Sequence, residues 1–214
     1  MGAAPNDPLS LAEWRRTVAE LYADVRAGSA EPERAAERFR ATRDRLFREH
    51  VDSPIPHVHR TRWRGASWFS YDLAWRIKGV VKPLANRTTF DIALAADGTT
   101  RCTRVASVEF AVGGTRYALA LYWFEGYGGG LWLPFGDSTN GTATYGGGRY
   151  LYDTIKGADL GASAGEFMLD FNFAYNPSCT YDDRWSCPLP PAENKLPFDV
   201  PAGERVFDLE DLTG

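Results

Sequence analysis

The sequence has little cysteine, histidine or methionine and no long apolar run. Its 214 residues include 3 cysteines, 3 histidines and 2 methionines. Three cysteines are too few, and odd in number, for a disulfide-stapled secreted domain. No stretch approaches the ~18 consecutive apolar residues of a membrane-spanning helix. The first residues also lack a basic segment followed by an apolar one, so the sequence predicts a cytoplasmic protein without a membrane segment.

Basic charge is not in excess either. The chain has 24 Lys and Arg against 28 Asp and Glu, and its formal net charge is -4. Nucleic acids and anionic membranes are bound by clustered basic surfaces, whereas here the basic residues are scattered. We therefore expect neither as a partner. A small-molecule ligand is the expected partner, and the oligomeric state is left open.

The first 50 residues predict a helical hairpin. Ser10 and Glu13 form an S-x-x-E capping box, and apolar residues then repeat at helical spacing as far as Gly28. A second helix is expected from about Glu31 and should stop before Asp52. The alternation of Arg and Glu along this second helix is typical of a solvated face.

Residues 51–214 change to aromatic, β-branched and glycine-rich sequence, which indicates sheet. Tight turns at Ala96-Asp97-Gly98 and Val112-Gly113-Gly114 favour antiparallel neighbours. The predicted fold is mainly β (α+β): an antiparallel β-barrel or strongly curled sheet, packed with the 1–50 hairpin into one compact unit and crossed by a C-terminal proline-rich loop. The predicted strands are Ala66 to Val81, Thr88 to Ala95, Arg101 to Val112, Arg116 to Phe124, Gly130 to Leu133 and Glu166 to Phe173.

The glycine-rich centre, from Gly126 to Gly148, is not a phosphate-binding loop. It lacks the G-x-G-x-x-G fingerprint opening a helix and the G-K-S/T ending of a Walker motif. The glycines are typical of positive φ or close backbone approach. Arg149, directly after the last glycine triplet, is the best candidate for binding an anionic group, because a guanidinium can hold a carboxylate or phosphate in bidentate fashion.

The segment from residue 166 to 198 carries the densest polar chemistry. It ends a strand-like run and then places acid, amide, phenol and thiol groups between prolines that stiffen the chain. Polar groups on one strand face must find partners, which are either each other or a ligand. The candidate catalytic residues are Asp170, Asn172, Tyr175 and Cys179.

The cysteines and histidines allow two further readings. Cys102, in an alternating run, is expected to be a buried small hydrophobe. Cys179 and Cys187 lie on either side of TYDDRWS, close enough for a disulfide bridge. Two free thiols, or thiols that stabilise the loop, are the simpler interpretation. Together with His57 and His59, these two cysteines have the residue types of a two-histidine, two-cysteine zinc site. Their spacing differs from a C-x-x-C knuckle, so no metal site is assigned.

Three motifs, TYGGGRYLYD, LDFNFAYNPSC and CPLPPAENKLP, make the chain resemble an uncharacterised bacterial and archaeal family known as domain of unknown function 1684 (DUF1684). The resemblance runs from about Trp14 to Arg205. It implies no reaction, but it implies which positions define the family: Asp137, Thr144, Tyr145, Arg149, Asp170, Asn172, Tyr175, Asn176, Cys179, Cys187, Glu193 and Asn194. The ligand-binding candidates among them are Asp137, Tyr145, Arg149, Asn176, Glu193 and Asn194.

Three functions stay open, and the sequence does not decide whether the protein is an enzyme. The first is a small-molecule binding or enzymatic pocket in which Arg149 holds an anionic group and Asp170, Asn172 and Tyr175 supply polar contacts. The second is a non-catalytic structural or interaction module with an internal hydrogen-bond network. The third is a flavin-binding split barrel, although no motif requires a cofactor. The pocket hypothesis predicts that Arg149 approaches Asp170 and Asn172.

Overall fold

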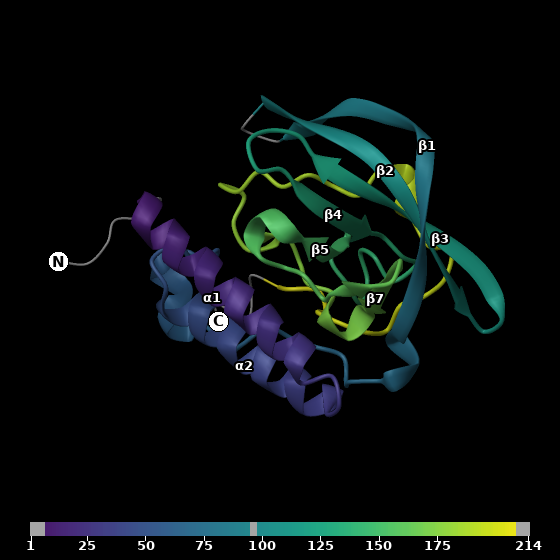
Figure 1. The fold of residues 1–214 in the computed structure, drawn as a ribbon. Helices are drawn as coiled ribbons and strands as arrows, with labels where there is room; N and C mark the ends of the chain where they lie inside the picture. The colour runs from purple at the N-terminus through teal and green to yellow at the C-terminus, as the bar shows by residue number, and fades with distance from the viewer. Residues whose placement is uncertain (1–6, 95–97, 209–214) are drawn as a thin grey trace.

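The chain forms a helical hairpin packed against a curled antiparallel sheet in a computed structural model that describes residues 7–94 and 98–208 (Figure 1). Helix α1 spans Pro8–Ala27, and α2 spans Pro32–Glu49. Each begins with proline in its first turn, where the missing N–H has no intrahelical partner to lose. Both predicted helices are therefore confirmed.

The start of α1 differs from the expected capping box. Asp7 is the N-cap, and its carboxylate accepts a hydrogen bond from the Leu9 amide at 2.8 Å. Ser10 lies inside the helix and donates through its hydroxyl to the Asp52 carboxylate at 2.5 Å. The S-x-x-E pattern missed the cap because aspartate three residues earlier fills the same role ahead of Pro8.

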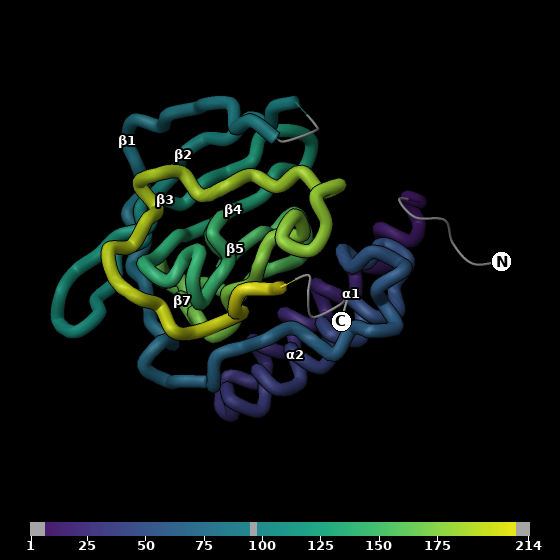
Figure 2. The backbone as a smooth tube through the Cα atoms, turned by 180° about the vertical axis from the view of Figure 1, so that it is seen from behind, coloured from purple at the N-terminus to yellow at the C-terminus, as the bar shows by residue number. Residues whose placement is uncertain are grey.

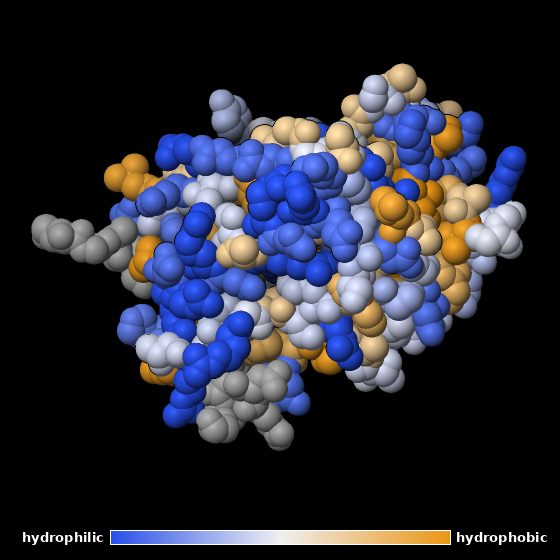
Figure 3. Space-filling model, turned by 90° about the horizontal axis from the view of Figure 1, so that it is seen from below, coloured by the Kyte–Doolittle hydropathy of each residue, from blue (hydrophilic) through white to orange (hydrophobic). Residues whose placement is uncertain are grey.

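The hairpin is attached to the sheet by aromatic packing. Phe39 of α2 is buried, with ring centroids 5.4 Å from Tyr22 of α1, 5.9 Å from Trp68 and 5.1 Å from Phe173. Such edge-to-face contacts add to the free energy of burial. Seen from below, the side on which the hairpin lies in Figure 1, the surface is largely hydrophilic, with apolar side chains gathered in one part (Figure 3).

All neighbouring strands of the sheet are antiparallel, in the order β5-β4-β3-β2-β1-β7-β6. Strands β5 and β6 form its two edges, so the sheet is curled rather than closed into a barrel. This confirms the predicted fold class in its curled-sheet form. The strands are β1 (Arg76–Leu94), β2 (Gly98–Val112), β3 (Thr115–Phe124), β4 (Gly130–Phe135), β5 (Arg149–Asp153), β6 (Ala162–Ser163) and β7 (Glu166–Asp170).

Several strand boundaries differ from the predictions. The two segments expected at 66–81 and 88–95 are one long strand, β1, with an irregularity between Pro83 and Thr88. Its regular part starts at Arg76, after a short 3-10 turn at Leu73–Trp75. Strand β7 ends at Asp170, because the Asp170 side chain accepts from the Asn172 amide and caps a 3-10 turn. The expected turn at Ala96-Asp97 lies outside the described residues.

Strand β3 is buried on both faces over its central part, as its sequence predicts. Leu119 and Leu121 join the main core with the helices, whereas Ala120 and Tyr122 join a second cluster with Trp132. Cys102 belongs to the second cluster and is fully buried, which confirms its expected role. The sheet therefore separates two apolar cores.

The C-terminal strap, defined here as residues 186–206, crosses the sheet and returns toward the helices (Figure 2). It is held mainly by main-chain hydrogen bonds, among them Leu196 to the Gly136 carbonyl at 2.8 Å and Glu204 to the Ala174 carbonyl at 2.8 Å. The expected proline-rich loop is thus fastened to the sheet along its length. No helix in residues 7–94 and 98–208 is long and apolar enough to cross a membrane.

Candidate functional site

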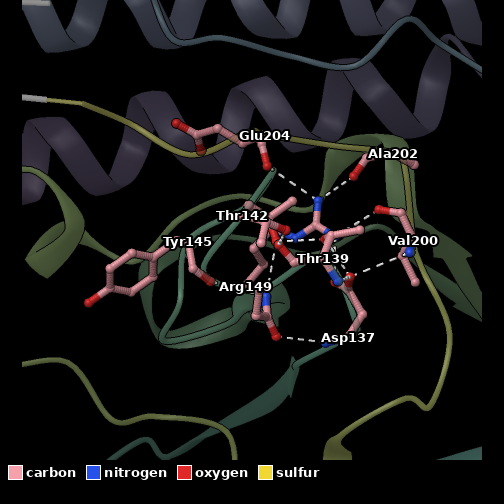
Figure 4. Close-up of polar contacts among 10 residues, drawn as sticks. Asp137, Thr139, Thr142, Tyr145, Arg149, Val200, Ala202 and Glu204 are labelled. Carbon is pink, nitrogen blue, oxygen red and sulfur yellow. Dashed lines mark hydrogen bonds and ion pairs between the residues drawn. The ribbon is translucent and has the colours of Figure 1, made fainter.

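Arg149 lies at the start of β5 with its side chain completely buried among the strap and the 137–144 turn (Figure 4). Its Nη2 donates to Asp137 Oδ2 at 2.8 Å and to the Val200 carbonyl at 3.0 Å. Its Nη1 donates to the carbonyls of Ala202 and Glu204. Burial lowers the pKa of Arg149, and the Asp137 carboxylate opposes this shift.

Asp137 is held by the turn that follows it. Its Oδ1 accepts from the Thr139 amide at 2.8 Å and from the Thr139 hydroxyl. The guanidinium of Arg149 also lies 5.0 Å from the Phe135 ring centroid. A buried ion pair of this kind needs its remaining donors and acceptors satisfied. Main-chain carbonyls of the strap accept from both terminal nitrogens of Arg149, whereas its Nε makes no hydrogen bond within the described residues. Arg149 therefore joins the glycine-rich centre to the strap.

Asn194 and Glu193 have different surroundings although they are neighbours. Asn194 is fully buried: its side chain accepts from the Ala120 amide at 2.7 Å and donates to the carbonyls of Ala120 at 2.9 Å and Pro134 at 2.7 Å. It thus pairs main-chain groups of β3 and β4 beyond the end of their own ladder. Glu193 is exposed and accepts from the Tyr122 hydroxyl at 2.7 Å.

Glu204 fastens the end of the strap to α2. Its buried carboxylate accepts from the Tyr181 hydroxyl, from the Asn176 amide at 2.8 Å and from Arg43 Nη2 at 3.2 Å. Burial raises the pKa of Glu204, although these three partners act in the opposite direction. In Figure 4 the Glu204 carboxylate points away from Arg149 and toward the helices. The solvated-face prediction is wrong for Arg43, which is largely buried against Phe47 and Tyr175.

Asp170 and Asn172 form a second polar cluster where β7 ends. Asp170 is buried and accepts from the Tyr71 hydroxyl at 2.9 Å and from the Asn172 side-chain amide at 2.9 Å. Asn172 also exchanges two hydrogen bonds with the main chain of Asp72, at 2.8 and 2.9 Å. Nε of Arg76 lies 3.6 Å from Asp170 Oδ2. Burial raises the pKa of Asp170, opposed by Asn172, Tyr71 and Arg76.

A cavity of about 330 Å³, named here the helix-strand cavity, lies beside Asp170 between the helical hairpin and the β1 and β7 end of the sheet. This volume lies at the lower end of small-molecule binding sites. Its apolar wall comprises Val25, Ala35, Leu160, Phe167, Met168 and Phe173.

Charged side chains of both signs line the same cavity. Lys78 is paired with Glu166 at 3.3 Å, and both are partly exposed. Arg26 donates to the Asp159 carbonyl at 2.5 Å. Arg76 has unused hydrogen-bond donors, because its two terminal nitrogens make no hydrogen bond to any residue in the described ranges. The arrangement can accept a molecule with an apolar body and an anionic end.

Arg149 and Asp170 do not meet, so the predicted approach is wrong. The side chains that contact Arg149 and those that contact Asp170 form separate sets. Phe135 packs against the Arg149 guanidinium, and its ring centroid lies 5.1 Å from that of Phe171, the residue after Asp170. We expected the two residues to meet because both lie in polar motifs. Asp170 ends β7, which pairs with β1, whereas Arg149 begins β5, which pairs with β4, so the two strands are not neighbours in the sheet.

Tyr175 and Asn176 lie at a smaller cavity of about 60 Å³ beneath α1. Three buried polar atoms of its lining make no hydrogen bond within the described chain: the Tyr22 hydroxyl, Arg43 Nε and Asn176 Oδ1. Burial raises the pKa of Tyr175 well above its ordinary value. A space of this size with polar walls suits ordered water.

Cys179 and Tyr145 contact each other, with the Tyr145 hydroxyl 3.8 Å from Cys179 Sγ. The Tyr145 ring points away from Arg149 in Figure 4. All three cysteines are free thiols. His57 and His59 lie on a 3-10 turn, His57–Arg62, and not in the extended segment expected of them. Within residues 7–94 and 98–208 no group of three or more His, Cys, Asp or Glu could hold a metal ion.

The sequence did not single out Arg76, Tyr71, Arg43 or Glu204. Tyr71 precedes β1, and Arg76 is its first residue. Only the pairing of β1 with β7 places them beside Asp170. Arg43 follows the helical periodicity of the buried Phe39, Leu46 and Phe47, a signal that could have marked it as inward-facing.

Comparisons with known proteins agree with the fold. A solved structure, the solution NMR structure of an uncharacterized protein from gene locus rrnAC0354 of Haloarcula marismortui, is 36% identical, with a TM-score of 0.62. The match covers 84% of this chain and 96% of that one. No curated protein matches. The family model described as "Protein of unknown function (DUF1684)" matches residues 61–205, a range that starts after the helical hairpin and not at Trp14. The chain therefore belongs to the DUF1684 family.

Proposed function

We propose that this protein binds a small molecule with an apolar body and an anionic group in the helix-strand cavity. One observation carries the proposal: a cavity of about 330 Å³ combines apolar walls with the Arg76 guanidinium, which is held beside the buried Asp170. Cavities that bind ligands commonly have this composition, with few polar groups fixed among apolar ones.

The charges of the lining favour an anion over a cation. Glu166 is already paired with Lys78 at the cavity wall. Asp170 already accepts hydrogen bonds from the Tyr71 hydroxyl and the Asn172 side-chain amide, so its carboxylate has partners within the protein. Arg76 keeps two terminal nitrogens for a carboxylate or phosphate, which a guanidinium binds in bidentate fashion. We assign the anion-binding role to Arg76 in place of Arg149.

Asp170, Asn172 and Tyr71 act in this proposal as supports of Arg76. Tyr71 and Asn172 direct their donors at the Asp170 carboxylate, which in turn faces Nε of Arg76. The ion pair with Asp170, at 3.6 Å from Nε, favours one side of the cavity for the guanidinium, which reduces the entropy lost when a ligand binds. The expected polar contacts at Asp170 and Asn172 are thus kept as positioning contacts.

For the residues around Arg149, we propose a structural role. The observation that favours it is the complete burial of Arg149 and Asp137, with the guanidinium bonded to carbonyls of the strap. The fully buried Asn194, which pairs main-chain groups of β3 and β4, supports the same role. These residues would form the internal network of the non-catalytic alternative, while ligand binding takes place elsewhere.

Titration calorimetry with decanoate tests the binding proposal, with decanol as the uncharged probe of similar shape. We expect wild type to bind decanoate more tightly than decanol. Arg76→Gln should weaken the affinity for decanoate at least about tenfold, because one charged contact is lost. Ala162→Phe places a large side chain at the exposed edge of the cavity and should weaken the affinity for both probes. Arg101→Gln, which removes a surface ion pair on β2, is the matched control and should change neither.

Equal affinity of wild type and Arg76→Gln for decanoate would overturn the assignment of Arg76. Failure of both probes to bind wild type would overturn the apolar cavity site itself. A visible absorbance spectrum of the purified protein separates this proposal from the flavin alternative, because bound oxidised flavin absorbs visible light whereas an aliphatic ligand does not.

A further inference from the structure

Two cysteines lie side by side at the edge of the C-terminal strap. The Cys179 amide donates to Cys187 Sγ at 3.4 Å. Both are free thiols, with Cys187 buried and Cys179 partly exposed. Two cysteines this close need only side-chain rotations to bring their sulfur atoms toward bonding distance. We name them the dithiol pair.

The surroundings of the two sulfurs differ. The groups that act on Cys187 Sγ are the Cys179 side chain, the main-chain amides of Cys179 and Ser178, which donate hydrogen bonds to it, and the charge of Lys156. The first of these contacts lowers the pKa of Cys187 most, and burial opposes it. Cys179 instead donates to Cys187, which raises its pKa, and burial adds to this. Cys187 is therefore arranged to carry the thiolate and Cys179 to keep its proton.

We propose that the dithiol pair is a redox-active site in which Cys187 reacts first with a hydroperoxide and Cys179 then closes a disulfide. The Cys187 thiolate attacks the terminal peroxide oxygen, the O–O bond breaks, and a sulfenic acid forms. The other oxygen leaves, after protonation, as an alcohol, or as water when the oxidant is hydrogen peroxide. The Cys179 sulfur then attacks the Cys187 sulfur, loses its proton and expels the second oxygen as water. Two thiols are oxidised by two electrons, and one hydroperoxide is reduced.

The bond would close a short loop that carries Tyr181. The Tyr181 hydroxyl donates to Glu204, and its ring packs 5.1 Å from Phe47 of α2. Oxidation would therefore restrict the segment that links the strap to the helical hairpin. This inference is independent of the ligand proposal, because neither cysteine lines the helix-strand cavity.

Cys102 is the internal control. It is fully buried in the second apolar cluster, and burial raises its pKa to about 12. A thiol in this state has almost no thiolate at neutral pH and should not react with peroxide. The chain therefore carries a reactive pair and an inert thiol of the same residue type.

Intact-mass measurement after hydrogen peroxide treatment tests the inference. Wild type should lose the mass of two hydrogen atoms and two of its three thiols, and recover both with a reductant. Cys179→Ser should accumulate a sulfenic acid at Cys187 that is captured by dimedone. Cys187→Ser should be labelled at least about tenfold more slowly, because Cys179 keeps its proton. Cys102→Ser should behave as wild type.

Two results would overturn the inference. One is faster dimedone labelling at Cys179 than at Cys187 in the two serine variants, which would reverse the order of reaction. The other is wild type that gains oxygen mass without losing a thiol pair. Circular dichroism of each serine variant checks that it is folded, and Cys102→Ser provides the reference rate for a folded single substitution.

Discussion

Arg149 Nη2 donates to Asp137 Oδ2 at 2.8 Å, and neither side chain is exposed to solvent. The guanidinium reaches the carbonyls of Val200 and Ala202 as well, so one side chain connects β5, the turn after β4 and the C-terminal strap. Removing one member of such a pair leaves the other as an uncompensated buried charge. This relationship supports the structural role proposed for Arg149.

Arg149→Met is predicted to lower the free energy of unfolding by about 3–5 kcal/mol, the usual cost of breaking a buried pair. Arg101→Met breaks the exposed pair with Asp91 and should leave the free energy of unfolding almost unchanged. Urea denaturation followed by tryptophan fluorescence measures both. Equal losses for the two variants would contradict a structural role for Arg149.

Asn194→Ala should destabilise the protein by at least about 2 kcal/mol, because one amide and two carbonyls of β3 and β4 lose their partner in a buried place. Its neighbour Glu193 is exposed, and Glu193→Ala should cost about 1 kcal/mol or less. Hydrogen exchange of the Ala120 amide provides the local readout. Unchanged protection of this amide in Asn194→Ala would contradict the assignment.

Gly203→Ala is predicted to disturb the strap more than the same substitution at Gly165. Both glycines have φ near +82°, so both alanines carry the left-handed strain of about 1–2 kcal/mol. A Cβ at residue 203 would lie 2.6 Å from the Ala174 carbonyl oxygen, whereas one at residue 165 meets no atom within 4 Å. Gly203→Ala should therefore lower the free energy of unfolding by at least about 2 kcal/mol more than Gly165→Ala does. Thermal denaturation of the pair measures the difference, and equal midpoints would argue against close packing of the strap.

Asp153→Asn should become more stabilising relative to wild type as the pH rises. Burial raises the pKa of Asp153 above 3.8, the ordinary value of an aspartate side chain, so the folded state binds this proton more tightly than the unfolded chain. The stability contributed by the proton is fully present below pH 3.8 and is lost as the pH rises through the raised pKa. Asparagine does not titrate. Denaturation at several pH values tests this, and a difference between the two proteins that falls with pH would contradict it.

The fold was more predictable than the site. Helical periodicity located both helices, although the capping box expected at Ser10 was wrong, and alternating apolar residues located β2 and β3, because these signals are local. The merging of two expected strands into β1 was not visible, since Pro83 is accommodated by an irregularity of pairing with β2. Strand β5 was not among the predicted strands, because all five of its residues are buried and give no alternation.

The site depended on contacts between distant residues. Motif residues such as Arg149 and Asn194 were identified, but a sequence does not tell a buried network from a pocket wall. The guanidinium that faces the cavity belongs to Arg76, which lies in no motif and is placed beside Asp170 by register alone. Arg43 was read as solvent-facing because arginine is usually exposed, whereas its partner Glu204 lies 161 residues away.

A crystal structure of the protein grown with saturating decanoate tests the central claim most directly. The account predicts the carboxylate within hydrogen-bond distance of Arg76 and the aliphatic chain against Phe167, Met168 and Phe173, with the Arg149 and Asp137 contact unchanged. A helix-strand cavity without decanoate, or decanoate bound at Arg149 with the strap displaced, would contradict it.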